Sequence, residues 1–154
     1  SVLLKENGIK VFNLNDVIEI AFYIDGADEV SPNNELIKGG GGAHTREKIV
    51  ASASNEFICI VDESKIVTEL GAFPLPVEVI PESRSLVARK IISMGGLPEY
   101  RSGFITDQGN HILDVRDIDL SNPELLEVMI NNIPGVVDNG IFAANKPQII
   151  LVPK

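Results

Sequence analysis

The sequence is poor in cysteine, aromatic residues and basic charge. Of its 154 residues one is cysteine, none is tryptophan and 5% are aromatic. A single cysteine, Cys59, excludes an internal disulfide and suits a reducing compartment, so we expect a cytoplasmic location. The 13 basic residues stand against 22 acidic ones, which gives a net charge of −9. This balance argues against nucleic acid and against an anionic membrane as partners.

Long hydrophobic runs are also lacking. No apolar run approaches the roughly 18 residues of a membrane span, and no signal-peptide layout is present. The chain does not begin with methionine, and residues 1–8 resemble the last turns of a helix with Gly8 past its end. We therefore expect no membrane segment, and we expect further sequence upstream of Ser1.

What the sequence does contain is a run of four glycines, 39–42, preceded by Lys38 and followed by a predicted helix over 43–53. A glycine loop that leads into a helix offers free N–H groups and the positive end of the helix dipole, which favours an anion such as phosphate. The run is not a Walker loop, in which lysine follows the glycines, and it lacks the third glycine of the dinucleotide fingerprint. A flexible solvent-exposed linker is the alternative interpretation.

Continuous apolar runs at 20–24 and 57–61 predict strands of a parallel sheet that are buried on both faces. With the intervening helix they form a strand–helix–strand pattern, which is typical of α/β proteins. A short strand is expected at 9–12. The last apolar segment, 148–152, is expected to return to the same sheet. The pattern predicts a Rossmann-like parallel-sheet domain that is incomplete at its N-terminus.

A proline-punctuated link at 73–76 suggests a domain boundary. Beyond it we expect, in order, a strand at 77–80, a helix over 83–94, an antiparallel pair of 98–106 with 111–115, a helix that begins at Asn122-Pro123, and a strand at 136–142. We interpret the chain as an α/β catalytic domain over 1–72 and 143–154. A small α+β domain of ferredoxin-like type is inserted over 73–142.

Polar residues follow the predicted parallel strands, where ligands bind in open α/β sheets. Asp25 and Asp28 are separated by Gly26 and Ala27, which are small enough for a ligand to pack against the backbone. Turn and capping chemistry is the alternative interpretation for both aspartates. No group has the spacing of a known metal loop, so we expect no metal.

The predicted helix after the glycines carries Glu47 in its first or second turn, where the helix dipole keeps a carboxylate ionised and able to accept a proton. An ordinary first-turn glutamate is the alternative. Arg46 and Lys48 point away from Glu47 and are expected to be solvated. His44 is expected to be a partly exposed loop residue, and Lys65 a surface charge.

Three segments together resemble the type A family of ribose-5-phosphate isomerases. They are Asp25-Gly26-Ala27-Asp28-Glu29, the glycine segment from Lys38 through Lys48, and Asp62-Glu63-Ser64-Lys65. The likeness continues through 73–81, 96–101, 106–110 and 133–137. It covers nearly the whole chain, and this set of motifs at these spacings is highly specific.

The resemblance implies an enzyme that interconverts ribose 5-phosphate and ribulose 5-phosphate through an enediolate, in the non-oxidative branch of the pentose phosphate pathway. It implies a phosphosugar substrate, no metal or nucleotide cofactor, and a homodimer. The family's N-terminal βαβ unit and Ser/Thr-rich phosphate loop have no counterpart in this sequence. A non-catalytic sugar-phosphate-binding module and an inactive fragment of the isomerase are alternatives, and a CoA-transferase-like acyl carrier is a weaker one.

The resemblance also assigns roles by motif position. Glu47 resembles the base that moves the proton between C1 and C2, and Asp25 and Asp28 resemble the carboxylates that hold the sugar hydroxyls and assist ring opening. Lys38 resembles the group that stabilises the enediolate oxygen. The other expected substrate contacts are Gly26, Ala27, Gly39, Gly40, Gly41 and Lys65.

Overall fold

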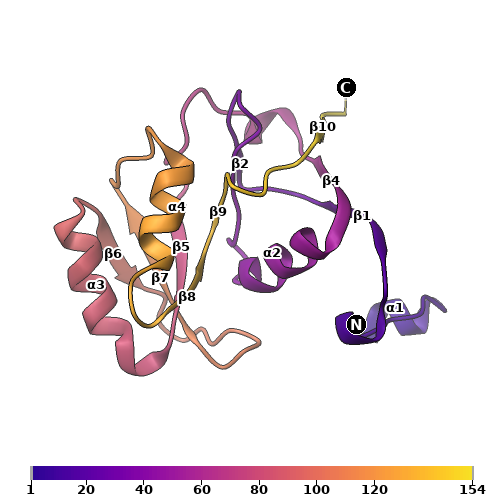
Figure 1. Cartoon of the computed structure of the whole chain (residues 1–154), viewed down its shortest axis with the longest axis horizontal. Coiled ribbons are helices and arrows are strands. Elements are labelled where there is room, and N and C mark those ends of the chain that lie inside the picture. The colour runs from indigo at the N-terminus through magenta and orange to yellow at the C-terminus, as the bar shows by residue number, and fades with distance from the viewer. Residues whose placement is uncertain (1, 154) are drawn as a thin grey trace.

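The strands form three sheets in the computed structural model, which describes residues 2–153 (Figure 1). The first sheet has the order β1-β4-β10 and is parallel throughout; its strands are β1 (Ile20–Asp25), β4 (Ser54–Ile60) and β10 (Ile149–Leu151). Helix α2 (His44–Ala53) connects towards β4 and packs on one face. This arrangement brings the ends of β1 and β4 beside the segment that precedes α2.

A small antiparallel sheet lies next to the first one. It has the order β2-β3-β9 and consists of β2 (Glu29–Val30), β3 (Leu36–Ile37) and β9 (Ile141–Phe142). All six residues are buried. Because β3 leads directly into Lys38, this buried sheet fixes the start of the glycine segment.

The third sheet is antiparallel with the order β6-β7-β5-β8. Its elements are β5 (Leu75–Val79), β6 (Leu97–Tyr100), β7 (His111–Arg116) and β8 (Val136–Asn139), with helices α3 (Arg84–Ser93) and α4 (Pro123–Asn131). Figure 1 shows α3 and α4 side by side over this sheet. Its central strand β5 is buried at every residue, and its apolar side chains form the larger core with those of both helices.

The remaining elements are short: two precede β1, one lies between β4 and β5, and one between β5 and α3. They are α1 (Val2–Glu6), η1 (Leu14–Asp16), η2 (Glu63–Lys65) and η3 (Pro81–Ser83). In residues 2–153 no helix has the length and apolar character needed to span a bilayer.

The predicted fold class is confirmed: a parallel α/β sheet is combined with an antiparallel α+β unit. The return of 148–152 to the first sheet is confirmed by the pairing of β10 with β4. The cap and first-turn proline at Asn122-Pro123 are confirmed as well, because the Asn122 side chain accepts from the N–H of Leu125. The division of domains at 72/73 and 142/143 stays a prediction, and its terminal residues Ser1 and Lys154 lie outside the described residues.

Three expectations about strands are wrong. Residues 9–12 form no strand and are exposed, because no neighbouring strand pairs with them. The runs 20–24 and 57–61 are not buried on both faces: Phe22 and Ile24 are 57% and 58% exposed, and Ile60 is 44% exposed. The run 136–142 is divided at Gly140 into β8 and β9, which pair in different sheets.

Candidate active site

The predicted catalytic residues gather around one cavity of about 240 Å³. Asp25 ends β1, Lys38 follows β3, and Glu47 lies in the first turn of α2. The cavity is lined by 25–28, 38–41 and Glu47. Residues that are separate in the sequence therefore meet at the carboxyl end of β1, as the polar strand ends indicate.

Lys38 is the centre of this cluster. Its Nζ lies 3.0 Å from Asp25 Oδ2 and 3.3 Å from Glu47 Oε2, and it also donates to the carbonyl of Gly26. The Lys38 side chain is only 4% exposed, whereas those of Asp25 and Glu47 are 34% and 27% exposed. The buried ammonium is thus balanced by two carboxylates that still reach the cavity.

Tyr23 is a member of the cluster to which the sequence analysis assigned no role. Its hydroxyl donates to Asp25 Oδ2, and its ring packs on Phe57 with centroids 4.8 Å apart. Burial raises the pKa of Asp25, but the hydrogen bond from Tyr23 and the charge of Lys38 outweigh it, so the net pKa lies below the ordinary value. The two-residue period of β1 is the signal that places Tyr23 and Asp25 on one face.

Glu47 has the opposite electrostatic environment. Burial raises its pKa above the ordinary value, the charge of Lys38 offsets this only in part, and the negative charge of Asp25 adds to it. Its buried Oε2 has no hydrogen-bond partner within residues 2–153, although Lys38 Nζ lies close by. A cavity-lining carboxylate whose pKa is raised above the ordinary value is suited to accept and return a proton.

The glycine loop is held close to Asp28. The N–H of Gly40 donates to Asp28 Oδ2 at 2.8 Å, and a Cβ on Gly40 would lie 2.9 Å from Asp28 Oδ1. The N–H of Gly42 donates to the carbonyl of Gly39 at 2.9 Å. The loop is therefore packed backbone rather than a flexible linker, and two of its N–H groups are already bonded within the chain.

The expectation that His44 is a partly exposed loop residue is wrong. His44 is the first residue of α2 and is fully buried, with Nε2 3.4 Å from the carbonyl of Asp138. Burial lowers its pKa below the ordinary value. A Cβ on Gly39, whose φ is +104°, would lie 2.6 Å from His44 Nδ1. Glycine at 39 thus leaves room for the imidazole.

The expectation for Lys48 is wrong as well, whereas the one for Arg46 is confirmed. Arg46 is 63% exposed and pairs with Asp107 at the surface. Lys48 is only 12% exposed because its Nζ reaches Glu127 and Asp138 from the antiparallel unit, each at 2.9 Å. Adjacent helical residues point in different directions, and this rule correctly predicts that Lys48 points away from Glu47. It does not reveal that the antiparallel unit covers the side of α2 on which Lys48 lies.

Two further cations lie at different distances from the cluster. Lys65 is at the end of η2 and does not line the 240 Å³ cavity, so its role stays a prediction. Arg101, which the sequence analysis passed over, contacts the glycine loop: its Nη1 lies 3.1 Å from the carbonyl of Gly40, while its Nε donates to Asp114 at 2.8 Å. No local pattern identifies such a contact over 61 residues.

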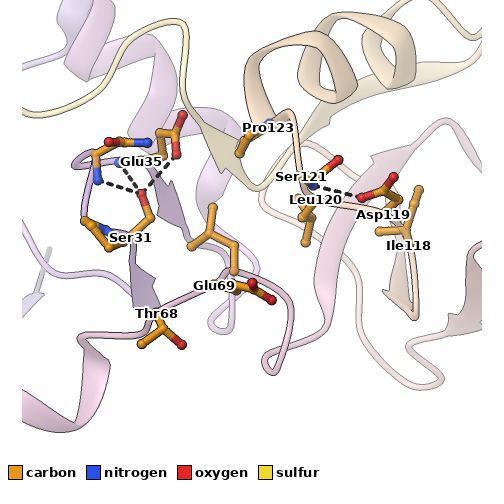
Figure 2. A pocket seen from close by; sticks show the side chains of 12 residues that line it. Ser31, Glu35, Thr68, Glu69, Ile118, Asp119, Leu120, Ser121 and Pro123 are labelled. Carbon is orange, nitrogen blue, oxygen red and sulfur yellow. Dashed lines mark hydrogen bonds between the residues drawn. The ribbon is translucent and has the colours of Figure 1, made fainter.

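A larger cavity, of about 550 Å³, opens elsewhere (Figure 2). Its walls come from 31–33, Glu35, 68–70, 118–121 and Pro123, and none of the predicted catalytic residues lines it. Its polar groups serve local turns: Ser31 Oγ accepts the N–H groups of Asn33 and Glu35. We therefore place the chemistry at the smaller cavity, where a buried cation and shifted carboxylates meet. Among residues 2–153 no group of three His, Cys, Asp or Glu side chains is arranged to hold a metal ion.

Comparisons with known proteins identify the family of the chain. The family model of ribose 5-phosphate isomerase A (phosphoriboisomerase A) matches residues 1–154. The chain is 59% identical over 150 residues to ribose-5-phosphate isomerase A of Legionella pneumophila (strain Lens), an alignment that covers 97% of this chain and 69% of that protein.

Solved structures give the same result. The crystal structure of ribose 5 phosphate isomerase A from Neisseria gonorrhoeae superposes with a TM-score of 0.97 at 52% identity, over 99% of this chain and 69% of that one. The ribose 5-phosphate isomerase A of Methanocaldococcus jannaschii superposes with a TM-score of 0.94 at 45% identity, over 99% of this chain and 70% of that one.

Proposed function

The chain belongs to the ribose 5-phosphate isomerase A family, an enzyme family that interconverts ribose 5-phosphate and ribulose 5-phosphate, and we propose that Glu47 is the base of this reaction. The observation that carries the proposal is the state of its carboxylate. Glu47 Oε2 is buried, lacks a hydrogen-bond partner among the described residues, and lies 3.3 Å from a buried ammonium. Such an oxygen can take a proton without first breaking a hydrogen bond to the backbone or to another side chain, and its ion pair with Lys38 keeps the carboxylate in the cavity.

The proposed step is a proton transfer between neighbouring carbons. Glu47 removes the proton from C2 of the open-chain aldose, and the electrons of that C–H bond form the C1–C2 double bond of an enediolate. The negative charge rests on the former carbonyl oxygen at C1. Glu47 then returns its proton to C1, while the hydroxyl proton at O2 is lost and O1 gains one, which yields the ketose.

Lys38 is the proposed partner of the developing charge. Two of its three ammonium protons are used by Asp25 Oδ2 and the carbonyl of Gly26. The third makes no hydrogen bond in the part of the chain that the structure describes, and we propose it as the donor to the enediolate oxygen, next to Glu47 at 3.3 Å. A donor that is already in place when the charge appears stabilises the transition state more than the substrate.

The other cavity residues are proposed to hold the substrate. Asp25 and Asp28 would accept the sugar hydroxyls and assist ring opening, because both residues line the cavity. The small residues Gly26 and Ala27 and the loop at 39–41 leave space for the sugar along the backbone. Lys65 is proposed as a further contact.

We further propose a homodimer that acts in the cytoplasm, as the family resemblance implies. The single cysteine supports a reducing compartment, and the net charge of −9 opposes an association with nucleic acid. The molar mass by light scattering tests the oligomeric state: twice the mass of one chain is expected, and a single chain mass at micromolar concentration contradicts the dimer.

The test of the proposed base is the Glu47→Gln enzyme. Its kcat for ribulose 5-phosphate formation is expected to fall by about 10²–10⁴-fold, with KM changed by less than about threefold, because the amide keeps the shape and loses the proton acceptor. Glu35→Gln, a glutamate outside the cavity, is the matched control. Near-normal turnover of Glu47→Gln contradicts the assignment.

A further inference from the structure

Lys48 follows the proposed base in α2 and makes a set of buried contacts that the reaction itself does not use. Its Nζ lies 2.9 Å from Glu127 Oε1, 2.9 Å from Asp138 Oδ1 and 2.7 Å from the carbonyl of Asn139. These three acceptors come from α4 and β8, so the cation joins the catalytic helix to the antiparallel unit. The Lys48 side chain is 12% exposed, and those of Glu127 and Asp138 are 7% and 12% exposed.

The two carboxylates are held in place by groups other than Lys48. Glu127 Oε2 accepts the N–H groups of Ala143 and Ala144 at 3.1 and 2.9 Å. Asp138 Oδ1 accepts the side-chain amide of Asn131 at 3.0 Å. The acceptors for the ammonium group are therefore fixed by neighbouring backbone and side chains, and Lys48 docks into a preformed site.

A second contact lies one turn earlier on the same face of α2. Thr45, three residues before Lys48, donates its hydroxyl to Glu78, a fully buried carboxylate on β5. Glu78 is itself held by Thr106 at 2.7 Å and by the amide of Asn110 at 2.8 Å. The helix is thus tied to the antiparallel unit at two points, and Glu47 lies between them in sequence and faces the other way.

We propose that Lys48 is a positioning residue for Glu47: its ion pairs with Glu127 and Asp138 fix the rotation of α2 and thereby keep the Glu47 carboxylate beside Lys38. This inference rests on the proposed function of Glu47. The geometry supports it because Glu47 Oε2 makes an ion pair with Lys38 at 3.3 Å but no hydrogen bond within residues 2–153, so the helix that carries Glu47 sets how closely the two charges approach. A displacement of about 1 Å in a reacting group can cost on the order of 10²-fold in rate.

The test compares Lys48→Met with Arg46→Met. Both variants remove one positive charge from a residue adjacent to Glu47, but Arg46 is exposed and tied only to the surface residue Asp107. For Lys48→Met we expect kcat to fall by about 10–100-fold with KM within about threefold. For Arg46→Met we expect kcat within about twofold of the parent enzyme, and Lys48→Arg is expected to recover much of the lost rate.

The pH profile separates positioning from a merely structural role. The groups that face Glu47 are Lys38, Asp25, Asp28 and Tyr23, and those that face Lys48 are Glu127, Asp138 and His44. If Glu47 drifts from Lys38, it loses the charge that lowers its pKa, so the acid limb of kcat moves to higher pH in Lys48→Met. A role in stability alone lowers the melting temperature and leaves both kcat and this limb in place.

Lys48→Met leaves two buried carboxylates without their cation, which destabilises the folded state. The combination of Lys48→Met, Glu127→Gln and Asp138→Asn leaves no unpaired buried charge at these positions, and Asp138→Asn alone retains the Lys48–Glu127 pair. Both are expected to lower kcat, the triple variant more. A folded triple variant, or a folded Asp138→Asn enzyme, with parental kcat and acid limb overturns the inference. If Glu47→Gln keeps the parental kcat, the proposed role of Glu47 as the base is wrong. If Glu47→Gln loses its activity but the Lys48, Glu127 and Asp138 variants keep the parental kcat, only the positioning role of Lys48 is wrong.

Discussion

The ammonium group of Lys38 lies 3.3 Å from the carboxylate of Glu47 without forming a hydrogen bond to it. The pair is therefore an ion pair between a buried cation and a partly buried carboxylate. Burial raises the pKa of Glu47, and Lys38 limits the rise. Both the reaction and the pH response of the enzyme depend on this balance.

The first consequence concerns the pH dependence of kcat. Glu47 acts as a base only when it is ionised, and its pKa is raised above the ordinary value of 4.5 by burial. We expect the acid limb of kcat to lie above pH 4.5 and to move further up in Lys38→Met, which removes the opposing charge. Steady-state rates between pH 4 and 9 measure this limb. If the acid limb of kcat stays at the same pH in Lys38→Met, the charge of Lys38 does not lower the pKa of Glu47.

The pH dependence of the free energy of unfolding reflects Glu47 and Asp25, whose pKa values shift in opposite directions on folding. The pKa of Glu47 is raised on folding, so between its unfolded and folded values the native state binds more protons, and this group's contribution to stability falls as pH rises through that window. The pKa of Asp25 is lowered on folding, so its contribution is present above 3.8 and is lost as pH falls towards the folded value. Urea unfolding of Glu47→Gln and Asp25→Asn at several pH values separates the contributions of the two carboxylates. If the free energy of unfolding changes with pH equally in the parent and in both variants, the two pKa shifts are not as described.

Gly39 provides a test of the packed loop. Its φ is +104°, and a Cβ there would lie 2.6 Å from His44 Nδ1 and 3.0 Å from His44 Cβ. Gly39→Ala is expected to lower the free energy of unfolding by roughly 1–3 kcal/mol, because the loop must change its backbone conformation or displace a buried ring. Gly41→Ala is the control for stability, since a Cβ at 41 meets no atom within 4 Å. Equal melting temperatures for the two variants would show that the loop is free to move.

Tyr23→Phe tests the support of Asp25. The variant keeps the ring contact with Phe57 and removes the hydroxyl that donates to Asp25 Oδ2. We expect a loss of about 1 kcal/mol in the free energy of unfolding and a rise in the pKa of Asp25. Carboxyl resonances followed by NMR during an acid titration measure that pKa, with Tyr100→Phe, an aromatic residue outside the cavity, as the control. An unchanged Asp25 titration would mean that the hydroxyl does not stabilise the carboxylate.

Much of the site could be predicted because its residues follow local rules. Asp25 comes directly after a continuous apolar run, and Lys38 and Glu47 flank a glycine loop that leads into a helix; each pattern predicts a ligand site at the end of a strand or the start of a helix. The structure brings all three to one cavity. Their catalytic roles remain proposals that the variants above test.

The parts that could not be predicted depend on contacts between distant segments. Lys48 looks like a solvated helix charge, because periodicity carries no information about the two carboxylates that lie 79 and 90 residues further on. The division of 136–142 has a similar cause: a Cβ on Gly140 would lie 2.2 Å from the carbonyl of Lys38, and this close approach separates β8 from β9. An apolar pattern cannot distinguish such a crossing from a continuous strand.

The most direct measurement of the central claim is hydrogen exchange at carbon. The parent enzyme and Glu47→Gln are each incubated with ribose 5-phosphate in D2O, and deuterium at C1 and C2 of the sugar phosphates is followed by NMR, while thermal shifts report substrate binding. If Glu47 carries the proton, the variant still binds the sugar phosphate, yet its isomerisation and its incorporation of carbon-bound deuterium are both slower than those of the parent by about 10²–10⁴-fold. Deuterium incorporation by Glu47→Gln at the parental rate would contradict the claim that Glu47 is the base.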